Sequence, residues 1–174
     1  MPRRPVRISP QHMTTAHDFS FAKLDEPGEV KLEDYAGKAV LVVNVASACG
    51  FTSQYRDLEA LYEAKAPKGL VVVGVPCNDF GQQESGSARE IREFCDTSYH
   101  VTFPMAGKVE IVSAERRHPF YKWIADELGD SALPRWNFHK YLIGKDGELV
   151  ASFGPKTAPL APDMLEAIKG ALAA

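Results

Sequence analysis

The sequence predicts an α/β fold with a central mixed sheet flanked by helices. Two aliphatic runs without polar alternation, residues 38–43 and 70–75, are typical of strands buried on both faces. The segment between them has apolar residues at helical spacing and stops at Pro67-Lys-Gly69. We therefore expect a right-handed β-α-β unit whose strands are parallel and lie in the middle of the sheet.

A β-hairpin is expected near the N-terminus, because residues 18–22 and 30–32 are short alternating stretches around a Pro-Gly turn. A polar loop, residues 76–86, follows the second buried strand. Ser87-Ala-Arg-Glu90 then has the form of a helix capping box. Three residues behind the box share one helical face: Ile91, Phe94 and Cys95.

In the second half of the chain, residues 101–105 predict a short extended piece that Pro104 places at an edge or an end. A helix is expected after His118-Pro119. Its predicted inward-facing residues are Phe120, Trp123, Ile124 and Leu128.

A second hairpin is predicted over residues 138–143 and 149–153, with Asp146-Gly147 as a two-residue turn. The last helix is expected to begin near Pro162, a favoured first-turn position. Its predicted apolar face is Leu165, Ile168 and Leu172. This order of elements, with a thiol after an early parallel strand, predicts a thioredoxin-like fold.

The composition predicts one globular domain over residues 14–174, preceded by a flexible, basic and proline-bearing tail over residues 1–13. The chain is 45% hydrophobic and 25% charged, and its net charge of -3 favours neither nucleic acid nor a stable membrane association. The first dozen residues lack the apolar core of a secretory signal. Three cysteines without short-range pairing fit a reducing compartment, so we expect a cytoplasmic protein.

The stretch Asn44-Val-Ala-Ser-Ala-Cys49-Gly-Phe-Thr52 places a thiol between the first buried strand and the following helix. Free backbone N–H groups and the helix dipole favour an anion there. The dipole contributes about 0.3–1 kcal/mol, less than the roughly 1.4 kcal/mol of one pKa unit, so a thiolate needs further donors. Position alone leaves a small buried apolar side chain as an equally good interpretation of Cys49.

Three later stretches could complete such a site. The two parallel strands end at the same edge of the sheet, so the loop after the second strand should lie beside the Cys49 turn. A glutamine amide in that loop could donate to the site. Trp136 and Asn137 carry N–H donors, and both reach one site only if at least one precedes the regular strand. Cys95 could attack a sulfenic acid, although a buried Cys95 would need its helix to unwind partly. Taken singly, a solvated loop and a core tryptophan are the better explanations of the first two stretches, and a core position also explains Cys95.

Together the three motifs resemble those of the glutathione peroxidases, in their cysteine-containing, non-selenium branch. The resemblance rests on Asn44-Val-Ala-Ser-x-Cys49-Gly-Phe-Thr, Cys77-Asn-x-Phe-Gly-x-Gln83-Glu and Trp136-Asn137-Phe138-x-Lys140, and it runs from about Thr14 to the C-terminus. It implies a thiol peroxidase that reduces hydrogen peroxide and organic or lipid hydroperoxides without a cofactor.

The resemblance also implies the role of each site residue. Cys49 attacks the distal oxygen of the peroxide and becomes a sulfenic acid. The side chains of Gln83, Trp136 and Asn137 donate hydrogen bonds. The backbone N–H groups near Gly50 and Phe51 help to hold developing charge.

In members that resemble this chain, the cysteine at the Cys95 position resolves the sulfenic acid, and thioredoxin, rather than glutathione, reduces the resulting disulfide. Only residues 129–135 stand where tetrameric members carry a longer insertion, which implies a monomer.

Two positions depart from the family pattern. Asp79 stands where glutamine is usual, and Gln82 stands where glycine is usual. An inward-facing Asp79 would oppose thiolate formation. We interpret Cys77 as a packed bystander.

Other functions of similar folds fit less well. Phe51 and Thr52 occupy the positions where a disulfide exchanger of the Cys-x-x-Cys type needs its second thiol, and the proline–threonine pattern of peroxiredoxins is absent. The five histidines show no ligand spacing with Cys49, so no metal site is expected. A redox sensor that signals through a Cys49–Cys95 disulfide stays open as an alternative, and sustained turnover would distinguish the enzyme from it.

Overall fold

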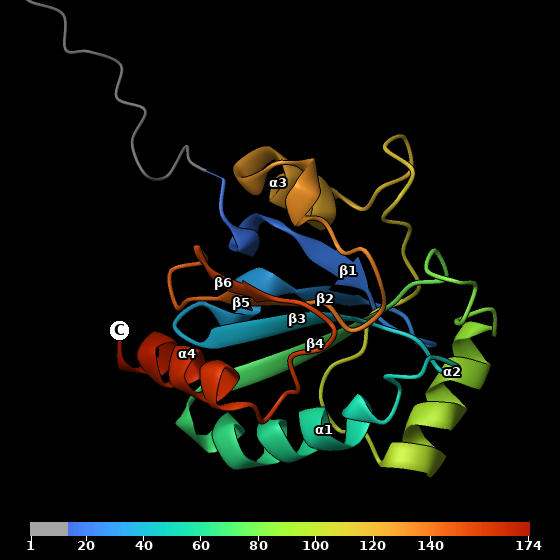
Figure 1. Ribbon diagram of the computed structural model, residues 1–174, viewed down its shortest axis with the longest axis horizontal. Helices are drawn as coiled ribbons and strands as arrows, with labels where there is room; N and C mark the ends of the chain where they lie inside the picture. Colours follow the sequence, from blue (N-terminus) through green and yellow to red (C-terminus); the bar gives the residue numbers. More distant parts are fainter. Residues whose placement is uncertain (1–13) are drawn as a thin grey trace, which may run out of the picture.

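A four-stranded mixed sheet in the order β4-β3-β5-β6 forms the centre of the computed structural model, which describes residues 14–174 (Figure 1). Strands β3 and β4 are parallel, and β5 and β6 are added antiparallel, which confirms the predicted mixed sheet. The strands are β3 (Ala39–Val45), β4 (Leu70–Pro76), β5 (Lys140–Ile143) and β6 (Leu149–Phe153). The expected tail, residues 1–13, lies outside the described residues.

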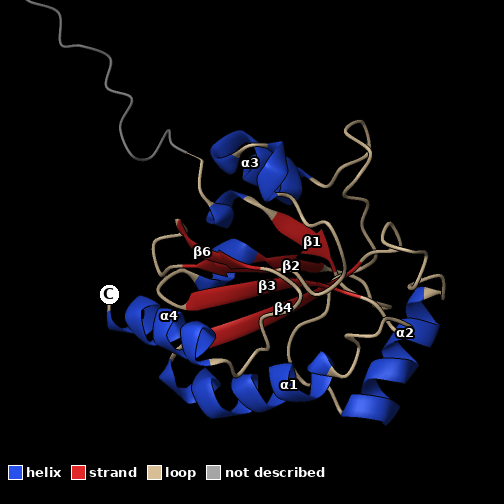
Figure 2. Cartoon of the chain, viewed as in Figure 1, coloured by secondary structure: helices blue, strands red, loops and turns tan. Residues whose placement is uncertain are grey.

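Helices cover both faces of this sheet (Figure 2). On one face lie α1 (Gln54–Lys65) and α4 (Pro162–Ala173), and on the other lie α3 (Pro119–Leu128) and the predicted N-terminal hairpin. That hairpin consists of β1 (Ser20–Ala22) and β2 (Glu29–Lys31), paired antiparallel. The short helix α2 (Ala88–Phe94) stands at the end of the sheet where β3 and β4 finish.

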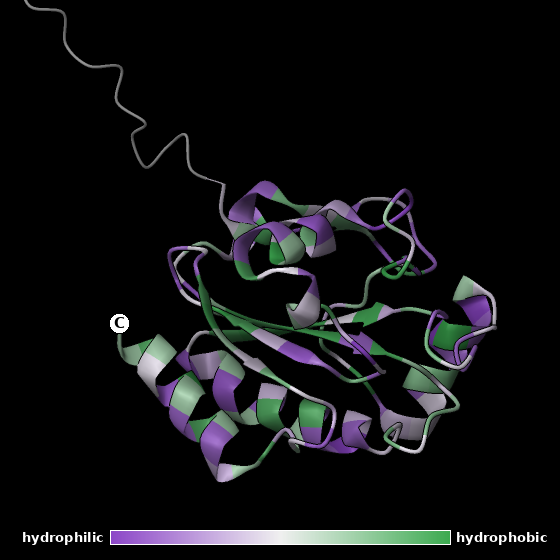
Figure 3. Cartoon of the chain, turned by 45° about the horizontal axis from the view of Figure 1, so that its top comes forward, coloured by the Kyte–Doolittle hydropathy of each residue, from purple (hydrophilic) through white to green (hydrophobic). Residues whose placement is uncertain are grey.

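The core consists of two apolar layers that the sheet separates. Every residue of β3 and β4 is buried, as the unbroken aliphatic runs predict. Leu41, Val43 and Val45 pack toward α1 and α4, whereas Val40 and Val42 pack toward α3 and the hairpin. Figure 3 shows the hydrophobic residues following the strands and the inner sides of the helices. No helix in residues 14–174 is long and apolar enough to cross a membrane.

Helix α2 begins with the predicted capping box. The Ser87 hydroxyl accepts the Glu90 N–H, and the Glu90 carboxylate accepts the Ser87 N–H. From Cys95 to Tyr99 the helix widens into a π-helical turn, which ends at His100 in a left-handed conformation with φ of 52°. Such π-helical turns are rare overall but frequent at functional sites.

Two details of the second half differ from prediction. Leu128 is 50% exposed, because α3 ends there and the chain turns away at Gly129. The last hairpin has a three-residue turn rather than a two-residue turn. The Gly144 N–H donates to the Glu148 carbonyl (2.9 Å), so residues 145–147 form the turn. Gly147, its last residue, has the left-handed conformation that such a turn needs, with φ of 85°.

The apolar face of α4 is rotated relative to the predicted one. Its buried residues are Met164, Ile168 and Ala171, whereas Leu165 and Leu172 are only partly covered. Residues 101–105 form no strand. Of these residues only Met105 pairs with β4, at Gly74. The segment therefore lies at the edge of the sheet, as Pro104 indicates.

Candidate active site

Cys49 lies in a tight turn between β3 and α1, and its residue surface is 9% exposed. The Thr52 hydroxyl holds the turn, because it accepts the Cys49 N–H (2.8 Å) and donates to the Ala46 carbonyl (2.9 Å). The Phe51 N–H donates to Cys49 Sγ at 3.3 Å. Within residues 14–174, Gly50 makes no such bond to the sulfur. One of the two expected backbone donors therefore reaches Sγ in this state.

Gln83 and Asn137 meet across two loops. Asn137 is fully buried, and its Nδ2 group donates to the Phe80 carbonyl (3.2 Å) and to Gln83 Oε1 (3.0 Å). A backbone carbonyl only accepts, so the Phe80 bond fixes the orientation of the Asn137 amide, which in turn fixes that of Gln83. Gln83 Nε2 is left to donate. Since Asn137 uses both of its N–H groups, it orients Gln83 instead of donating to the thiolate or peroxide as expected.

Trp136 lies over the loop that carries Gln83. Its ring packs against Phe80 with 6.4 Å between ring centroids. It also lies so close to Gly81 that a Cβ atom there would be 2.7 Å from the indole. Gly81 has φ of +73°, so this position requires glycine both for conformation and for space. Trp136 and Asn137 both precede β5, as their joint access to one site requires.

Asn44 is a residue whose role we did not infer from the sequence. It is fully buried in β3, and its Nδ2 donates to the Trp136 carbonyl (3.0 Å), while its Oδ1 accepts the His139 N–H (3.1 Å). Its own carbonyl accepts the Phe138 N–H at 2.6 Å. Asn44 thus fixes the segment that carries Trp136 and Asn137. An amide inside a strand that is otherwise aliphatic is the signal that indicates such a role.

Replacing Asn44 by alanine is expected to lower the free energy of unfolding by about 2–4 kcal/mol, because a buried side chain is lost and two partly buried backbone groups lose their partners. Urea unfolding followed by circular dichroism measures this. Ser20→Ala, which removes an exposed hydroxyl bonded to Glu29, is the control and should cost about 0.5 kcal/mol or less. Equal losses in the two variants would contradict the role of Asn44.

Lys140 is a fully buried cation in β5, and its Nζ donates to three backbone carbonyls, at Gly154 (3.5 Å), Pro155 (3.3 Å) and Thr157 (2.6 Å). The Pro155 carbonyl also accepts Gln54 Nε2 (2.7 Å), at the first residue of α1. Lys140 therefore helps to tie the loop after β6 to the helix that follows Cys49. Burial lowers the pKa of Lys140 to about 7.

This lowered pKa predicts a pH-dependent stability. Between pH 7 and 10 the unfolded chain keeps the proton that folded Lys140 loses, so raising the pH stabilises the fold through this group. The unfolding free energy of the wild type minus that of Lys140→Met should rise by at most about 1.4 kcal/mol per pH unit in this range. Lys156 is an exposed lysine in the loop after β6 that Lys140 binds, and Lys156→Met should show no such rise. A flat difference for Lys140→Met would contradict the prediction.

Cys95 is fully buried, at the point where α2 becomes π-helical. Burial raises the pKa of its thiol to about 11, with the charge of Glu84 acting in the same direction and the Tyr55 hydroxyl acting against it. Cys95 and Cys49 belong to the same core layer, and both are free thiols. Cys95 must therefore leave this apolar environment before its thiolate can attack Cys49.

Asp79 and Cys77 both lie away from the thiol chemistry. The Asp79 carboxylate accepts the N–H groups of Ile111 (2.6 Å) and Val112 (2.9 Å), so it anchors that loop rather than facing Cys49. Cys77 is fully buried, and burial raises its thiol pKa to about 12. It behaves as a packed thiol.

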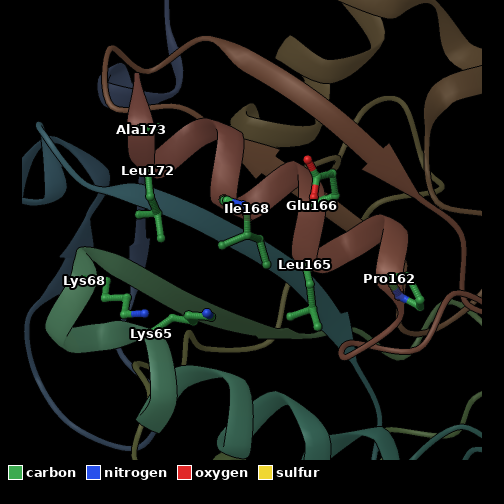
Figure 4. Close-up of a pocket in the computed structure, with 9 residues that line it drawn as sticks. Lys65, Lys68, Pro162, Leu165, Glu166, Ile168, Leu172 and Ala173 are labelled. Carbon is green, nitrogen blue, oxygen red and sulfur yellow. The ribbon is translucent and has the colours of Figure 1, made fainter.

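A cavity of about 560 Å³ lies at the other end of the sheet, between α4 and the end of α1 (Figure 4). Leu165, Ile168 and Leu172 line it from α4, opposite Lys65 and Lys68. Lys68 precedes β4, whereas Gln83 follows it, so this cavity and the Cys49 turn are at opposite ends of the strand. In the part of the chain that the structure describes, no group of three His, Cys, Asp or Glu side chains is placed to hold a metal ion.

Residues 16–125 match the family model described as glutathione peroxidase. A glutathione peroxidase of Lactococcus lactis is 45% identical over 156 residues, 88% of this chain and 96% of that protein. The hydroperoxy fatty acid reductase gpx1 of Synechocystis is 41% identical over 160 residues (87% and 94%). The thioredoxin/glutathione peroxidase BtuE of Escherichia coli is 40% identical over 172 residues (86% and 93%).

A solved structure, that of a thioredoxin-family thiol:disulfide interchange protein from Chlorobium tepidum, shares the fold with a TM-score of 0.67. The match covers 91% of this chain and 96% of that one at 18% identity, and it confirms the predicted thioredoxin-like architecture. The family model matches more than half of the chain, and the relatives align over nearly their whole length. The chain therefore belongs to the glutathione peroxidase family.

Proposed function

We propose that this protein is a thiol peroxidase in which Cys49 reduces hydroperoxides. The observation that carries this proposal is the Phe51 N–H directed at Cys49 Sγ at 3.3 Å, in a turn that also holds the Gln83 loop. The Cys49 thiolate attacks the distal peroxide oxygen and the O–O bond breaks. The leaving alkoxide or hydroxide takes up a proton to become alcohol or water, and Cys49 becomes a sulfenic acid.

The surrounding groups stabilise the charge that moves during this step. The Phe51 N–H holds the sulfur anion, and Gln83 Nε2 and the Trp136 indole N–H serve as donors to the sulfur or the peroxide oxygens. Asn137 supports the reaction through Gln83, because one of its N–H groups binds Gln83 Oε1 while the other binds the Phe80 carbonyl and fixes the amide. Such fixed donors cost no reorganisation at the moment of reaction.

Cys95 then resolves the sulfenic acid. Its thiolate attacks the Cys49 sulfur, a disulfide forms, and the hydroxyl group leaves as water after taking up a proton. Because Cys95 is buried, the end of α2 must open first, and the π-helical turn from Cys95 to Tyr99 supports such opening. A thioredoxin-type dithiol returns both cysteines to thiols. The printed name of the Escherichia coli relative, thioredoxin/glutathione peroxidase, supports this class of reductant.

The substrates we propose include hydrogen peroxide and organic or lipid hydroperoxides. The name of the Synechocystis relative, hydroperoxy fatty acid reductase, supports the lipid substrates. Three free cysteines support a reducing compartment such as the cytoplasm. The short connection over residues 129–135 supports a monomer.

The test is steady-state consumption of a hydroperoxide coupled to NADPH oxidation through thioredoxin and thioredoxin reductase, with glutathione and glutathione reductase run in parallel. We expect sustained NADPH loss with thioredoxin and little with glutathione. Efficient cycling with glutathione would contradict the proposed reductant and the role of Cys95. Oxidation of Cys49 without turnover in either system would favour the redox sensor.

A further inference from the structure

Glu84 is a buried carboxyl group that the proposed chemistry does not use. It is 1% exposed, and in residues 14–174 no lysine, arginine or histidine side chain lies within ion-pair distance of it. Burying a carboxylate without a counter-ion costs free energy unless hydrogen bonds compensate. Burial accordingly raises the pKa of Glu84, and its contacts with Ser47 and the more distant charge of Lys108 act in the opposite direction. Because burying this carboxyl group costs free energy, a structural or functional contact should explain its position.

The contacts of Glu84 join the two loops that carry Cys49 and Gln83. Glu84 Oε1 accepts the N–H of Ser47 (3.1 Å), two residues before Cys49. The neighbouring Gln83 carbonyl accepts the N–H of Ala48 (3.1 Å). On the other side, the Glu84 N–H donates to Asn78 Oδ1 (2.9 Å), at the start of its own loop. Two consecutive residues of one loop thus bind two consecutive residues of the other.

We propose that Glu84 is a positioning residue that holds Cys49 and Gln83 at a fixed separation by binding the backbone of the Cys49 turn. This inference rests on the proposed function, because the separation matters only if the sulfur and the Gln83 amide act on one peroxide. Glu84 does not touch the peroxide. It acts through the Ser47 N–H on one side and through its covalent neighbour Gln83 on the other.

The carboxyl group suits this task because of its reach. Ser47 follows the end of β3 by two residues, where the strand ladder no longer satisfies its N–H. Within residues 14–174, Glu84 Oε2 and the Ser47 hydroxyl are also buried beside this bond and have no hydrogen-bond partner. Without Glu84 the Ser47 N–H is left unpaired, and the turn is free to shift relative to Gln83. A shift of about 1 Å in a reacting group can cost about 100-fold in rate.

The experiment compares Glu84→Ala, Glu84→Gln and Glu84→Asp. Glutamine keeps an acceptor of the same length without the charge, whereas aspartate keeps the charge and loses one methylene of reach. Glu59→Ala is the matched control, because Glu59 is also a buried glutamate that accepts a loop N–H, that of Thr102 (2.8 Å), outside the two loops. Each variant is made in a Cys95→Ser background, so that only the first oxidation of Cys49 is followed.

Two readouts are measured in each variant: the second-order rate of Cys49 oxidation by cumene hydroperoxide, and the hydrogen exchange of residues 46–49. In Glu84→Ala and Glu84→Asp we expect faster exchange at Ser47 and oxidation slowed by about 10- to 100-fold. In Glu84→Gln and Glu59→Ala both readouts should stay within about threefold of the parent.

Two patterns would overturn the positioning role. One is a Glu84→Gln variant as slow as Glu84→Ala, which would assign the effect to charge. The other is unchanged exchange at Ser47 in Glu84→Ala, or in Glu84→Asp if the alanine variant does not fold. The exchange measurement needs no peroxide reaction. If the parent itself does not react with peroxide, the proposed function fails, while the contact between the loops is still tested.

Discussion

Replacing Cys49 by serine is expected to reduce hydroperoxide consumption by about 1,000-fold or more while leaving the fold intact. A serine hydroxyl is a far weaker nucleophile than a thiolate toward peroxide oxygen, and no other cysteine is placed to substitute for Cys49. Cys77 and Cys95 are fully buried, and burial raises the pKa of both thiols, to about 12 and about 11. The thioredoxin-coupled NADPH assay measures this loss.

Cys77→Ser is the control for removing a thiol from this chain. Because Cys77 is fully buried in the core layer that does not contain Cys49, this variant should lose stability rather than peroxidase activity, measured per folded molecule. Thermal unfolding of the two serine variants separates these effects. Activity in Cys49→Ser close to that of the wild type would remove Cys49 from the mechanism.

Replacing Cys95 by serine is expected to separate the two halves of the reaction. One equivalent of peroxide should still oxidise Cys49, because the Phe51 N–H and Gln83 do not depend on Cys95. Cycling with thioredoxin should fall by about 100-fold or more, because no internal thiol is left to form the disulfide that a dithiol reductant attacks. Stopped-flow oxidation and steady-state NADPH consumption measure the two halves separately.

Mass spectrometry supplies the control for this prediction. After one equivalent of peroxide the wild type should carry a disulfide between residues 49 and 95, and the Cys95→Ser variant should carry a sulfenic acid at residue 49 that dimedone traps. Full cycling of the Cys95→Ser variant with thioredoxin would show that Cys95 is a core residue and does not resolve.

Most of the fold could be predicted because its main signals are local. The aliphatic runs of β3 and β4, the capping box at Ser87 and the stop at Gly69 each report a physical requirement of a few neighbouring residues. The errors occur where tertiary packing decides. Leu128 fits the helical period, yet its helix ends there, and the face of α4 depends on which stripe meets the sheet.

The candidate site could be predicted as a set of residues but not as a set of contacts. Adjacent parallel strands bring the Cys49 turn and the Gln83 loop to one sheet edge, which their order in the chain already indicates. The hydrogen-bonding roles are not local. Asn137 turns toward Gln83 and Phe80, Asp79 turns toward Ile111, and Asn44 binds residues more than ninety positions away.

The left-handed backbone at Phe138, with φ of 66°, bears on when the active site is assembled. An aromatic residue adopts this conformation at a cost of about 1–3 kcal/mol, and it persists only where surrounding contacts dictate it. Here the Phe138 N–H bond to the Asn44 carbonyl and full burial of the ring supply those contacts during folding. Trp136 and Asn137, which directly precede Phe138, are therefore in place before peroxide arrives. Substrate capture should then need little ordering of this segment, and its rate should depend on access to Cys49 instead of on induced fit.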